Sequence, residues 1–311
     1  IINNRDWKWN FSVDGTFVKN KIIKLPNNQN LPGQNLFMGE SLYIFKDYEF
    51  AGVDQLTGQS MYYIDPLSPD FMKYDANGVM YYDEAAYQTQ IDKAMSDKEA
   101  VFIKDGDKYY TSNMNNASRR ILGSALPVVY GSFSTNVSWK GINLGLLFTY
   151  SLGGKTLDSN YQALMSAGMS ALHKDVLKSW TQPADHFDEN GQLLPWVTKA
   201  IAEGTMTEGR LDPKGTPQFN SRYTGYNNAS SSRFLTSSSY LTLKNINVSY
   251  DFPRKWVDAM KMQGLNLGFS CDNVFIVAKR KGMNPTYGFA GGQGANYVPA
   301  RVFAFQLTAQ F

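Results

Sequence analysis

The chain has 311 residues, of which 14% are aromatic and 18% charged, and its formal net charge is +3. Charged residues make up about 25% of an ordinary soluble protein, so this composition is shifted away from that class. The small positive charge forms no basic stripe, which argues against a nucleic-acid partner. One cysteine excludes a disulfide framework within the chain, and the two histidines make a catalytic triad or a multi-histidine metal site hard to assemble. We therefore expect no enzymatic activity, no metal and no cofactor.

No apolar run approaches the roughly 18 residues that a membrane-spanning helix needs. A transmembrane β-barrel needs no such run, because its strands alternate apolar and polar side chains and average to a polar total such as the mean hydropathy of −0.36 found here. The chain also contains 19 tyrosines and 19 phenylalanines, which suit the aromatic girdles of such a barrel. The composition therefore leaves a barrel open as a fold.

The first predicted strand runs from Trp7 to Phe17, where aromatic and apolar side chains alternate with polar ones. Residues 20–39 lose this pattern and carry prolines, glycines and asparagines, which predicts a connection. Alternation returns over Ser41 to Ala51, a second predicted strand whose apolar face is broken by Lys46. Its opposite face, which includes Tyr43, Asp47 and Glu49, is expected to point into the barrel lumen.

Two long polar stretches, residues 52–126 and 153–237, interrupt the strands and carry many turn signals. In the first, we expect a short helix over Glu84–Met95 and a hairpin over Val101–Tyr110 that turns at Asp105-Gly106. In the second, apolar residues at helical spacing predict a helix over Tyr161–Trp180. This helix packs against the loop layer in one interpretation and contacts a partner protein in the other.

Residues Val129–Trp139 and Ile142–Ser151 form the clearest strand pair. If Lys140-Gly141 is a two-residue turn, Trp139 and Ile142 lie opposite each other and must point to the same side of the sheet. Both are apolar, so the apolar faces deduced separately for the two strands lie on the same side of the sheet. A hairpin is therefore predicted here.

Three further strands follow, over Tyr240–Phe252, Leu265–Asp272 and Arg301–Phe311. Pro253 ends the first of them. The last alternates strictly over about ten residues, the length with which a tilted strand crosses a bilayer, and it ends the chain on an aromatic residue.

The seven predicted strands are joined by short and long connections in alternation, which predicts an all-β fold: a transmembrane antiparallel β-barrel with long extracellular loops. If the closing strand descends to the periplasm, an odd strand count makes the first strand descend as well. A closed barrel normally has an even count, so we expect additional strands from a region that precedes Ile1. Residues near strand ends are expected to form the membrane girdle: Trp7, Trp9, Trp139, Tyr150, Tyr250 and Phe311.

Several segments of the chain, in this order, resemble the C-terminal barrel of the SusC/RagA-type TonB-dependent outer-membrane transporters of Bacteroidetes. They are G-V-D-Q-L-T-G-Q (Gly52–Gln59), I-L-G-S-A-L-P-V-V-Y-G-S-F (Ile121–Phe133), W-K-G-I-N-L-G-L-L-F (Trp139–Phe148), S-S-S-Y-L-T-L-K-N-I-N-V-S-Y-D-F-P (Ser237–Pro253) and D-N-V-F (Asp272–Phe275). The resemblance implies that residues 1–311 are the C-terminal part of a 22-stranded plugged barrel, with the plug and the N-terminal strands outside this chain.

The resemblance further implies import of oligomeric glycans or peptides beneath a SusD-like surface lipoprotein, driven by TonB through an upstream region. Aromatic and acidic side chains of the lumen and loops are the candidate ligand contacts: Tyr43, Asp47, Glu49, Tyr62, Tyr63, Tyr226 and Tyr287. Two other functions remain open at this point. One is a passive, porin-like barrel, and the other is a secreted β-rich carbohydrate-binding protein.

Overall fold

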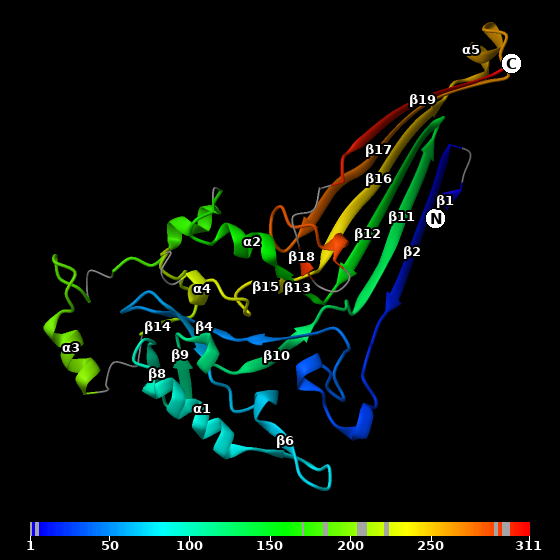
Figure 1. The fold of residues 1–311 in the computed structure, drawn as a ribbon. Helices are drawn as coiled ribbons and strands as arrows, with labels where there is room; N and C mark the ends of the chain where they lie inside the picture. The colour runs from blue at the N-terminus through cyan, green and yellow to red at the C-terminus, as the bar shows by residue number, and fades with distance from the viewer. Residues whose placement is uncertain are drawn as a thin grey trace. The chain divides into compact units, whose positions relative to one another are not determined.

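The structure is a computed structural model, and it describes residues 2–3, 6–169, 171–182, 186–203, 210–220, 224–288, 292–293 and 299–311 (Figure 1). The chain divides into two compact units. The sheet unit consists of Ile1–Lys19, Ala125–Thr156 and Ser237–Phe311, and the loop unit consists of Asn20–Ser124 and Leu157–Thr236. The sheet unit is thus assembled from three segments that the loop unit separates in sequence.

The sheet unit contains one antiparallel sheet of seven strands in the order β1-β2-β11-β12-β16-β17-β19. Its strands are β1 (Ile2–Asn3), β2 (Trp7–Phe17), β11 (Val129–Trp139), β12 (Ile142–Leu152), β16 (Tyr240–Asp251), β17 (Gly264–Ala278) and β19 (Val302–Gln310). The six long strands run side by side (Figure 1). Six of the seven predicted strands are confirmed.

The register of the ladder aligns apolar residues of all six long strands in rows across one face of the sheet. Strands alternate their side chains between two faces, so residues paired across the ladder share a face. One row contains Trp7, Trp139, Ile142, Tyr250, Leu267 and Leu307, and the next contains Trp9, Val137, Leu144, Val248, Phe269 and Phe305. Ring contacts join neighbours along this apolar face, including Trp7 with Trp139 at 5.6 Å and Phe133 with Phe148 at 4.6 Å between centroids.

The opposite face of the same strands is polar. Its rows include Lys8, Ser138, Asn143, Ser249, Gly268 and Gln306, followed by Asn10, Asn136, Gly145, Asn247, Ser270 and Ala304. Side-chain hydrogen bonds cross between strands here. Asn143 Nδ2 donates to Asp251 Oδ2 at 2.9 Å, and Asn266 Nδ2 donates to Asp251 Oδ1 at 2.7 Å. The sheet is therefore two-faced along its whole width.

The predicted hairpin between β11 and β12 is confirmed. Lys140 and Gly141 have φ values of 47° and 86°, and Trp139 pairs with Ile142. Positive φ at both central residues is the mark of a type I′ turn, whose twist matches that of the flanking strands. This turn fixes the register of both eleven-residue strands.

Ser41–Ala51 is extended over most of its length, but its predicted place in the barrel wall is wrong, because it is not in the seven-stranded sheet. It forms β3 (Ile44–Tyr48), which pairs with β10 (Arg119–Ser124) in the loop unit, and β4 (Phe50–Asp54) begins at its end. Lys46, which breaks the apolar face, is almost fully buried and lies 2.6 Å from the carboxylate of Asp70. A buried ammonium needs such a partner, and a lipid-facing strand would not supply one.

This correction reverses the predicted direction of the first strand. Without Ser41–Ala51, β2 pairs antiparallel with β11, and five antiparallel pairings separate it from β19. If β19 descends, β2 ascends, and β1, which pairs antiparallel with β2, descends. The additional strands expected to precede Ile1 stay a prediction.

The loop unit has its own small sheet in the order β14-β4-β5-β9-β8. These strands are β14 (Leu211–Asp212), β4, β5 (Ser60–Tyr63), β9 (Lys108–Thr111) and β8 (Phe102–Asp105), and a separate hairpin joins β6 (Met72–Tyr74) to β7 (Met80–Tyr82). The helix α1 (Glu84–Ser96) buries Ile91 and Ala94 against Ile64. The predicted helix over Glu84–Met95 and the predicted hairpin are both confirmed, although Asp105 pairs with Lys108 and the turn is Gly106-Asp107, one residue later than expected.

The predicted helix over Tyr161–Trp180 is wrong for most of its length. Only α2 (Ser159–Leu164) is α-helical, and a 3₁₀ turn, η5 (Lys174–Lys178), follows after a break. Gly168 has a φ of 91°, a conformation that a helix cannot contain. The apolar spacing therefore did not mark one helical face.

The remaining elements are short. They are η1 (Pro26–Asn28), η2 (Pro32–Gln34), η3 (Pro69–Phe71), η4 (Met114–Asn116), β13 (Lys155–Asp158), α3 (Pro195–Ala202), α4 (Thr224–Asn227), β15 (Leu235–Ser237), α5 (Arg254–Ala259), η7 (Pro285–Tyr287) and β18 (Gly292–Gln293). Within the described ranges, no helix has both the length and the apolar character to cross a membrane.

A glycine position tests the tight approach of β2 to β11. A Cβ on Gly131 would collide with the backbone of Asp14 and lie 2.9 Å from the Cα of Gly15. We therefore expect Gly131→Ala to force the two strands apart and to lower the free energy of unfolding by about 1–3 kcal/mol. The urea midpoint of the protein in detergent micelles measures this loss. Gly268→Ala is the matched control, because its Cβ would have only an ordinary 3.7 Å contact with Gln306. Equal midpoints for the two variants would contradict the prediction.

Candidate functional site

The apolar face of the sheet unit is the most extensive candidate surface. It exposes large side chains on both outer long strands, among them Phe11 at 47% and Val13 at 64% on β2 and Phe305 at 79% on β19. Its rows run over about ten residues per strand, which gives a band roughly 25 Å tall at the tilt of a barrel strand. Exposed apolar area of this extent requires an apolar partner. Its dimensions fit the hydrocarbon layer of a membrane.

The residues expected to form the girdle lie at both ends of the apolar face. Trp7, Trp139 and Tyr250 share one row at the end where the Lys140-Gly141 turn lies, and Trp9 is in the adjacent row. Phe311 follows β19 at the same end and is 81% exposed. Their role at a membrane interface stays a prediction.

Tyr150 lies toward the opposite end of the face. Its hydroxyl donates to the carbonyl of Asp14 at 2.9 Å, across the strand pair in which Gly15 faces Gly131. The two glycines leave space for the tyrosine ring, because they have no side chains. A Cβ added to Gly15 would lie only 2.9 Å from the Tyr150 hydroxyl.

A hollow of about 500 Å³ lies on the polar face around Gly145. Four asparagines line it: Asn136, Asn143, Asn245 and Asn247. Carboxamides are uncharged and both donate and accept hydrogen bonds. The hollow can therefore hold neutral polar groups such as hydroxyls or peptide amides.

The structure relocates the three residues expected to face the lumen from Ser41–Ala51. Tyr43, Asp47 and Glu49 belong to the loop unit, so their placement on a barrel strand is wrong. Asp47 accepts hydrogen bonds from Ser230 Oγ at 2.5 Å and from the Tyr48 amide at 2.9 Å. Both contacts hold the carboxylate within the loop unit.

The four tyrosines proposed from the loops differ in accessibility. Tyr62 is 1% exposed, packs with Tyr48, Ala117 and Ala229, and donates its hydroxyl proton to the Tyr226 carbonyl. Burial raises the pKa of Tyr62, and its side chain contributes to the core. Tyr63 is half-buried with its ring 5.5 Å from that of Tyr110, while Tyr226 is 40% exposed. The side chain of Tyr287 is outside the described residues.

Sequence reasoning overlooked an exposed group on the β6–β7 hairpin. Met80, Tyr81 and Tyr82 are 51%, 46% and 38% exposed. The signal was present in the run V-M-Y-Y directly after the D-A-N-G turn, which is the second arm of a hairpin. Tyr81 and Tyr82 are thus exposed aromatic side chains of the loop unit, as is Tyr226.

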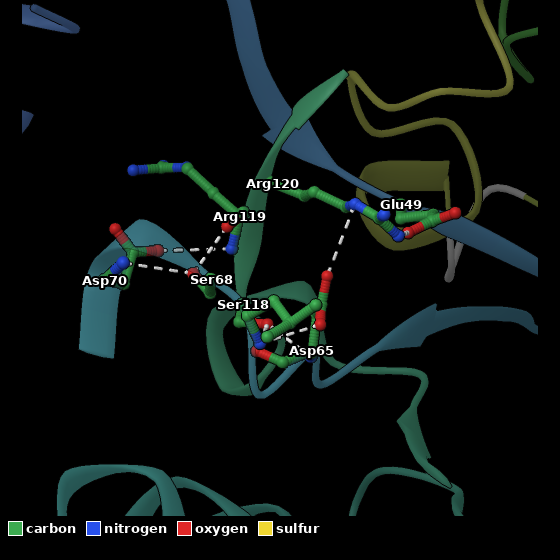
Figure 2. Close-up of polar contacts among 8 residues, drawn as sticks. Glu49, Asp65, Ser68, Asp70, Ser118, Arg119 and Arg120 are labelled. Atoms are coloured by element: carbon green, nitrogen blue, oxygen red, sulfur yellow. Dashed lines mark hydrogen bonds and ion pairs between the residues drawn. The ribbon is translucent and has the colours of Figure 1, made fainter. Parts of the chain in front are cut away.

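A network of charged and polar groups ties β3 and β10 to η3 in the loop unit (Figure 2). Arg120 Nη1 lies 2.8 Å from Glu49 Oε2, and its Nε lies 3.4 Å from Asp65 Oδ2. The side chain of Asp65 is only 4% exposed, and this oxygen has no hydrogen-bond partner. The charge and hydrogen bond of Glu49 raise the pKa of Arg120. Arg120 thus supplies the counter-charge of a buried carboxylate.

The second half of the network secures η3. Ser68 Oγ accepts from the Asp70 amide at 3.1 Å and donates to the Arg119 carbonyl at 2.5 Å, and the Arg119 amide donates to Asp70 Oδ2 at 3.1 Å (Figure 2). Because Asp70 also pairs with Lys46, its carboxylate is neutralised. In the part of the chain that the structure describes, no group of three or more His, Cys, Asp or Glu residues could hold a metal. The arrangement stabilises the loops and leaves these carboxylates paired.

The chain is similar to two proteins of Formosa agariphila. TonB-dependent receptor P3 is 22% identical over 307 residues, covering 91% of this chain and 24% of the receptor, and TonB-dependent receptor P39 is 21% identical over 305 residues, covering 93% and 26%. The chain therefore spans about a quarter of the length of these relatives. No family model matches the chain.

Solved structures of the RagAB peptide transporter show the same fold. One aligns with a TM-score of 0.62 at 20% identity, covering all of this chain and 28% of that one. The RagAB peptide importer in its open-open state aligns with a TM-score of 0.62 at 19% identity, covering 27% of its chain. The all-β barrel architecture and the resemblance to a portion of SusC/RagA-like TonB-dependent transporters are thus confirmed.

Removing the guanidinium of Arg120 should destabilise the loop unit. A fully buried pair costs about 3–5 kcal/mol to break, and because Arg120 is 44% exposed we expect Arg120→Gln to cost about 1–2 kcal/mol. Hydrogen exchange of the β3 and β10 amides measures the loss. Asp65→Asn in the same chain removes the orphaned charge and should recover much of it. An Arg119→Gln variant loses no acidic partner, only the contact of its guanidinium with the Tyr48 ring, and should lose less protection than Arg120→Gln.

The ionisation of Asp97 is expected to make the stability of the loop unit depend on pH. The Asn113 side chain, with Asn116 and the Glu99 and Ala100 amides, holds the pKa of Asp97 below its usual value. A depressed pKa adds stability that is complete above the unfolded value of about 3.9 and is lost as the pH falls through the folded value. Exchange of the η4 amides, corrected for the intrinsic pH effect, should therefore accelerate below about pH 4. The Asp97→Asn variant should lack this acid-induced step.

Proposed function

We propose that this chain forms part of the barrel wall of an outer-membrane transporter that imports oligomeric nutrients, either glycans or peptides. The observation that carries the proposal is the continuous apolar face across six long antiparallel strands, backed by a polar face on the same strands. Lipid contact on one side and an aqueous passage on the other require this division. The similarity to TonB-dependent receptors and to the RagAB fold supports it.

Under this proposal, residues 1–311 are a C-terminal part of the barrel, and the plug and the other strands lie outside them. The polar face lines the passage, where neutral carboxamides bind and release polar oligomers by hydrogen bonds. A SusD-like lipoprotein covers the extracellular side, and TonB supplies energy through an upstream region. The role is non-enzymatic, because guiding a solute past a wall requires no bond to be made or broken.

The loop unit is proposed to meet the substrate or the lipoprotein. Its exposed aromatic side chains include Tyr226, Tyr81 and Tyr82, whose faces suit sugar rings and hydrophobic peptide side chains. Tyr43, Asp47, Glu49 and Tyr63 remain candidates at their positions in the loop unit. Tyr62 is excluded from this surface by its burial.

An uptake experiment tests the function. Cells that lack the gene, and the same cells complemented with it, are supplied with fluorescent oligopeptides or oligosaccharides, with and without a proton uncoupler and in a strain without TonB. We expect complementation to restore uptake of one oligomer class, and uncoupling or loss of TonB to abolish it. Uptake that continues without TonB would indicate a passive porin, and a protein that is soluble without detergent would indicate a secreted binding protein.

Two neighbouring residues of β16 test which face meets lipid. Val248 is on the apolar face and Asn247 on the polar face, and both are exposed. Arginine on the lipid face of a barrel costs about 2–4 kcal/mol at the bilayer midplane and less toward the interface. Because Val248 shares a row with Trp9 near one end of the face, we expect Val248→Arg to cost about 1–2 kcal/mol, and to lower the urea midpoint of the membrane-inserted protein and its yield in the outer membrane. Asn247→Arg, the matched control, should be tolerated in contact with water. If Asn247→Arg lowered the urea midpoint more than Val248→Arg, the face of Asn247 would be the one that contacts lipid.

A further inference from the structure

The short connection between β16 and β17 contains α5, a six-residue helix over Arg254–Ala259. Figure 1 places α5 at the end of the sheet where the C-terminus lies. This is also the end with the row of Trp7, Trp139 and Tyr250, since Tyr250 pairs with Leu267 near the start of β17. The helix is thus a structured part of the turn side of the sheet unit.

The apolar face continues from β16 onto α5. Tyr250 and Phe252 have ring centroids 5.0 Å apart, and Phe252 and Trp256 have theirs 6.1 Å apart. Trp256 is nevertheless 56% exposed, and Met260 is 44% exposed. Together these side chains extend the apolar surface beyond the last row of the strands.

Internal contacts fix the helix in place. Val257 is 1% exposed and holds α5 against the rest of the turn. Arg254 Nη1 donates to the carbonyl of Gln263 at 2.9 Å, which closes the connection at the start of β17. The exposure of Trp256 is therefore a property of an anchored helix.

Cations surround this apolar tip. Arg254, Lys255 and Lys261 stand against one acid, Asp258, and in the adjacent turn Lys140 lies 5.5 Å from the Trp139 ring centroid. Tryptophan prefers the boundary between hydrocarbon and headgroups, and each lysine or arginine close to an anionic membrane surface adds attraction. Exposed tryptophan with flanking cations, continuous with an apolar face, matches the chemistry of an anionic bilayer surface.

We propose that α5 is an interfacial anchor, in which Trp256 and Met260 enter the headgroup boundary and Lys255 and Lys261 bind anionic phospholipid headgroups. The inference rests on the proposed function, because it requires the sheet to span a membrane. It adds a lipid-binding element on the turn side of the barrel wall. The anchor fixes the depth of the wall in the membrane at this end.

A depth measurement tests the position of α5. Trp256→Cys is made in a Cys271→Ala background, labelled with a nitroxide in the chain at its natural full length, and reconstituted in vesicles. Phe305→Cys on the apolar face and Lys104→Cys on the loop hairpin are the reference sites. We expect the accessibility of the label at position 256 to oxygen and to a water-soluble nickel chelate to lie between the two references.

The outcomes separate the two proposals. Water-like accessibility at position 256, with a lipid-like Phe305 site, overturns the anchor and leaves the transporter proposal intact. Exclusion of both reagents from position 256 indicates a covering protein and also overturns the anchor. A water-like Phe305 site overturns the proposed function itself.

A lipid titration tests the charges. Phosphatidylglycerol is added to the full-length protein in neutral detergent micelles, and bound lipid is measured by native mass spectrometry. The double variant Lys255→Gln, Lys261→Gln removes two cations. We expect the Kd of the most tightly bound lipid to rise about thirtyfold, because each cation contributes a factor of about five. The pair Lys104→Gln and Lys108→Gln is the control and should leave the affinity unchanged. Equal affinity in the α5 variant and the wild type would overturn the headgroup contact.

Discussion

The register of the antiparallel ladder is the constraint on which the rest of the sheet unit depends. Side chains alternate with a period of two, so a slip of one residue in any pairing would move an entire apolar row to the polar face. From Trp7 to Phe17, β2 pairs with β11 without a shift, and β11 pairs with β12 in the same way. The type I′ turn at Lys140-Gly141 fixes one of these pairings. The paired ladder also satisfies the backbone groups of these central strands, as a hydrocarbon environment demands.

A β-bulge in β16 keeps the apolar side chains of that strand on one face of the sheet. In β16, Leu241 and Leu243 precede Lys244, whereas Ile246, Val248 and Tyr250 follow it, so the apolar positions change from odd to even. The pairing of β16 with β12 shifts by one residue between Leu243 and Asn245, which returns both sets to the apolar face. Lys244 is the extra residue, and its ammonium donates to Asn273 Oδ1 at 3.3 Å. The phase change was visible in the sequence and could have predicted this bulge.

The strands of the sheet unit were predictable because a two-faced sheet imposes one simple period on the sequence. In the loop unit only local elements such as α1 and the β8–β9 hairpin were predictable, because its packing follows no single period. Ser41–Ala51 alternates like a membrane strand, and only the pairing of Lys46 with Asp70, 24 positions away, shows that it belongs to a small packed unit. The burial of Tyr62 likewise depends on the distant segments of Ala117 and Ala229. By contrast, the failed helix over Tyr161–Trp180 had a local warning in Gly168.

Under the proposed function, the two units differ in the chemistry that they offer an oligomer. The hollow on the polar face is lined by asparagine carboxamides and serine hydroxyls, which are neutral donors and acceptors and can bind either hydroxyls or peptide groups. In the proposed transporter, such a wall would discriminate poorly between a glycan and a peptide, and low selectivity would favour release during passage. The acids that secure the β3–β10 region are already paired with Lys46 and Arg120, so their charges are engaged within the loop unit. We infer that discrimination between substrate classes depends on the exposed aromatic side chains of the loops, where ring stacking and hydrophobic contact distinguish a sugar from a peptide side chain.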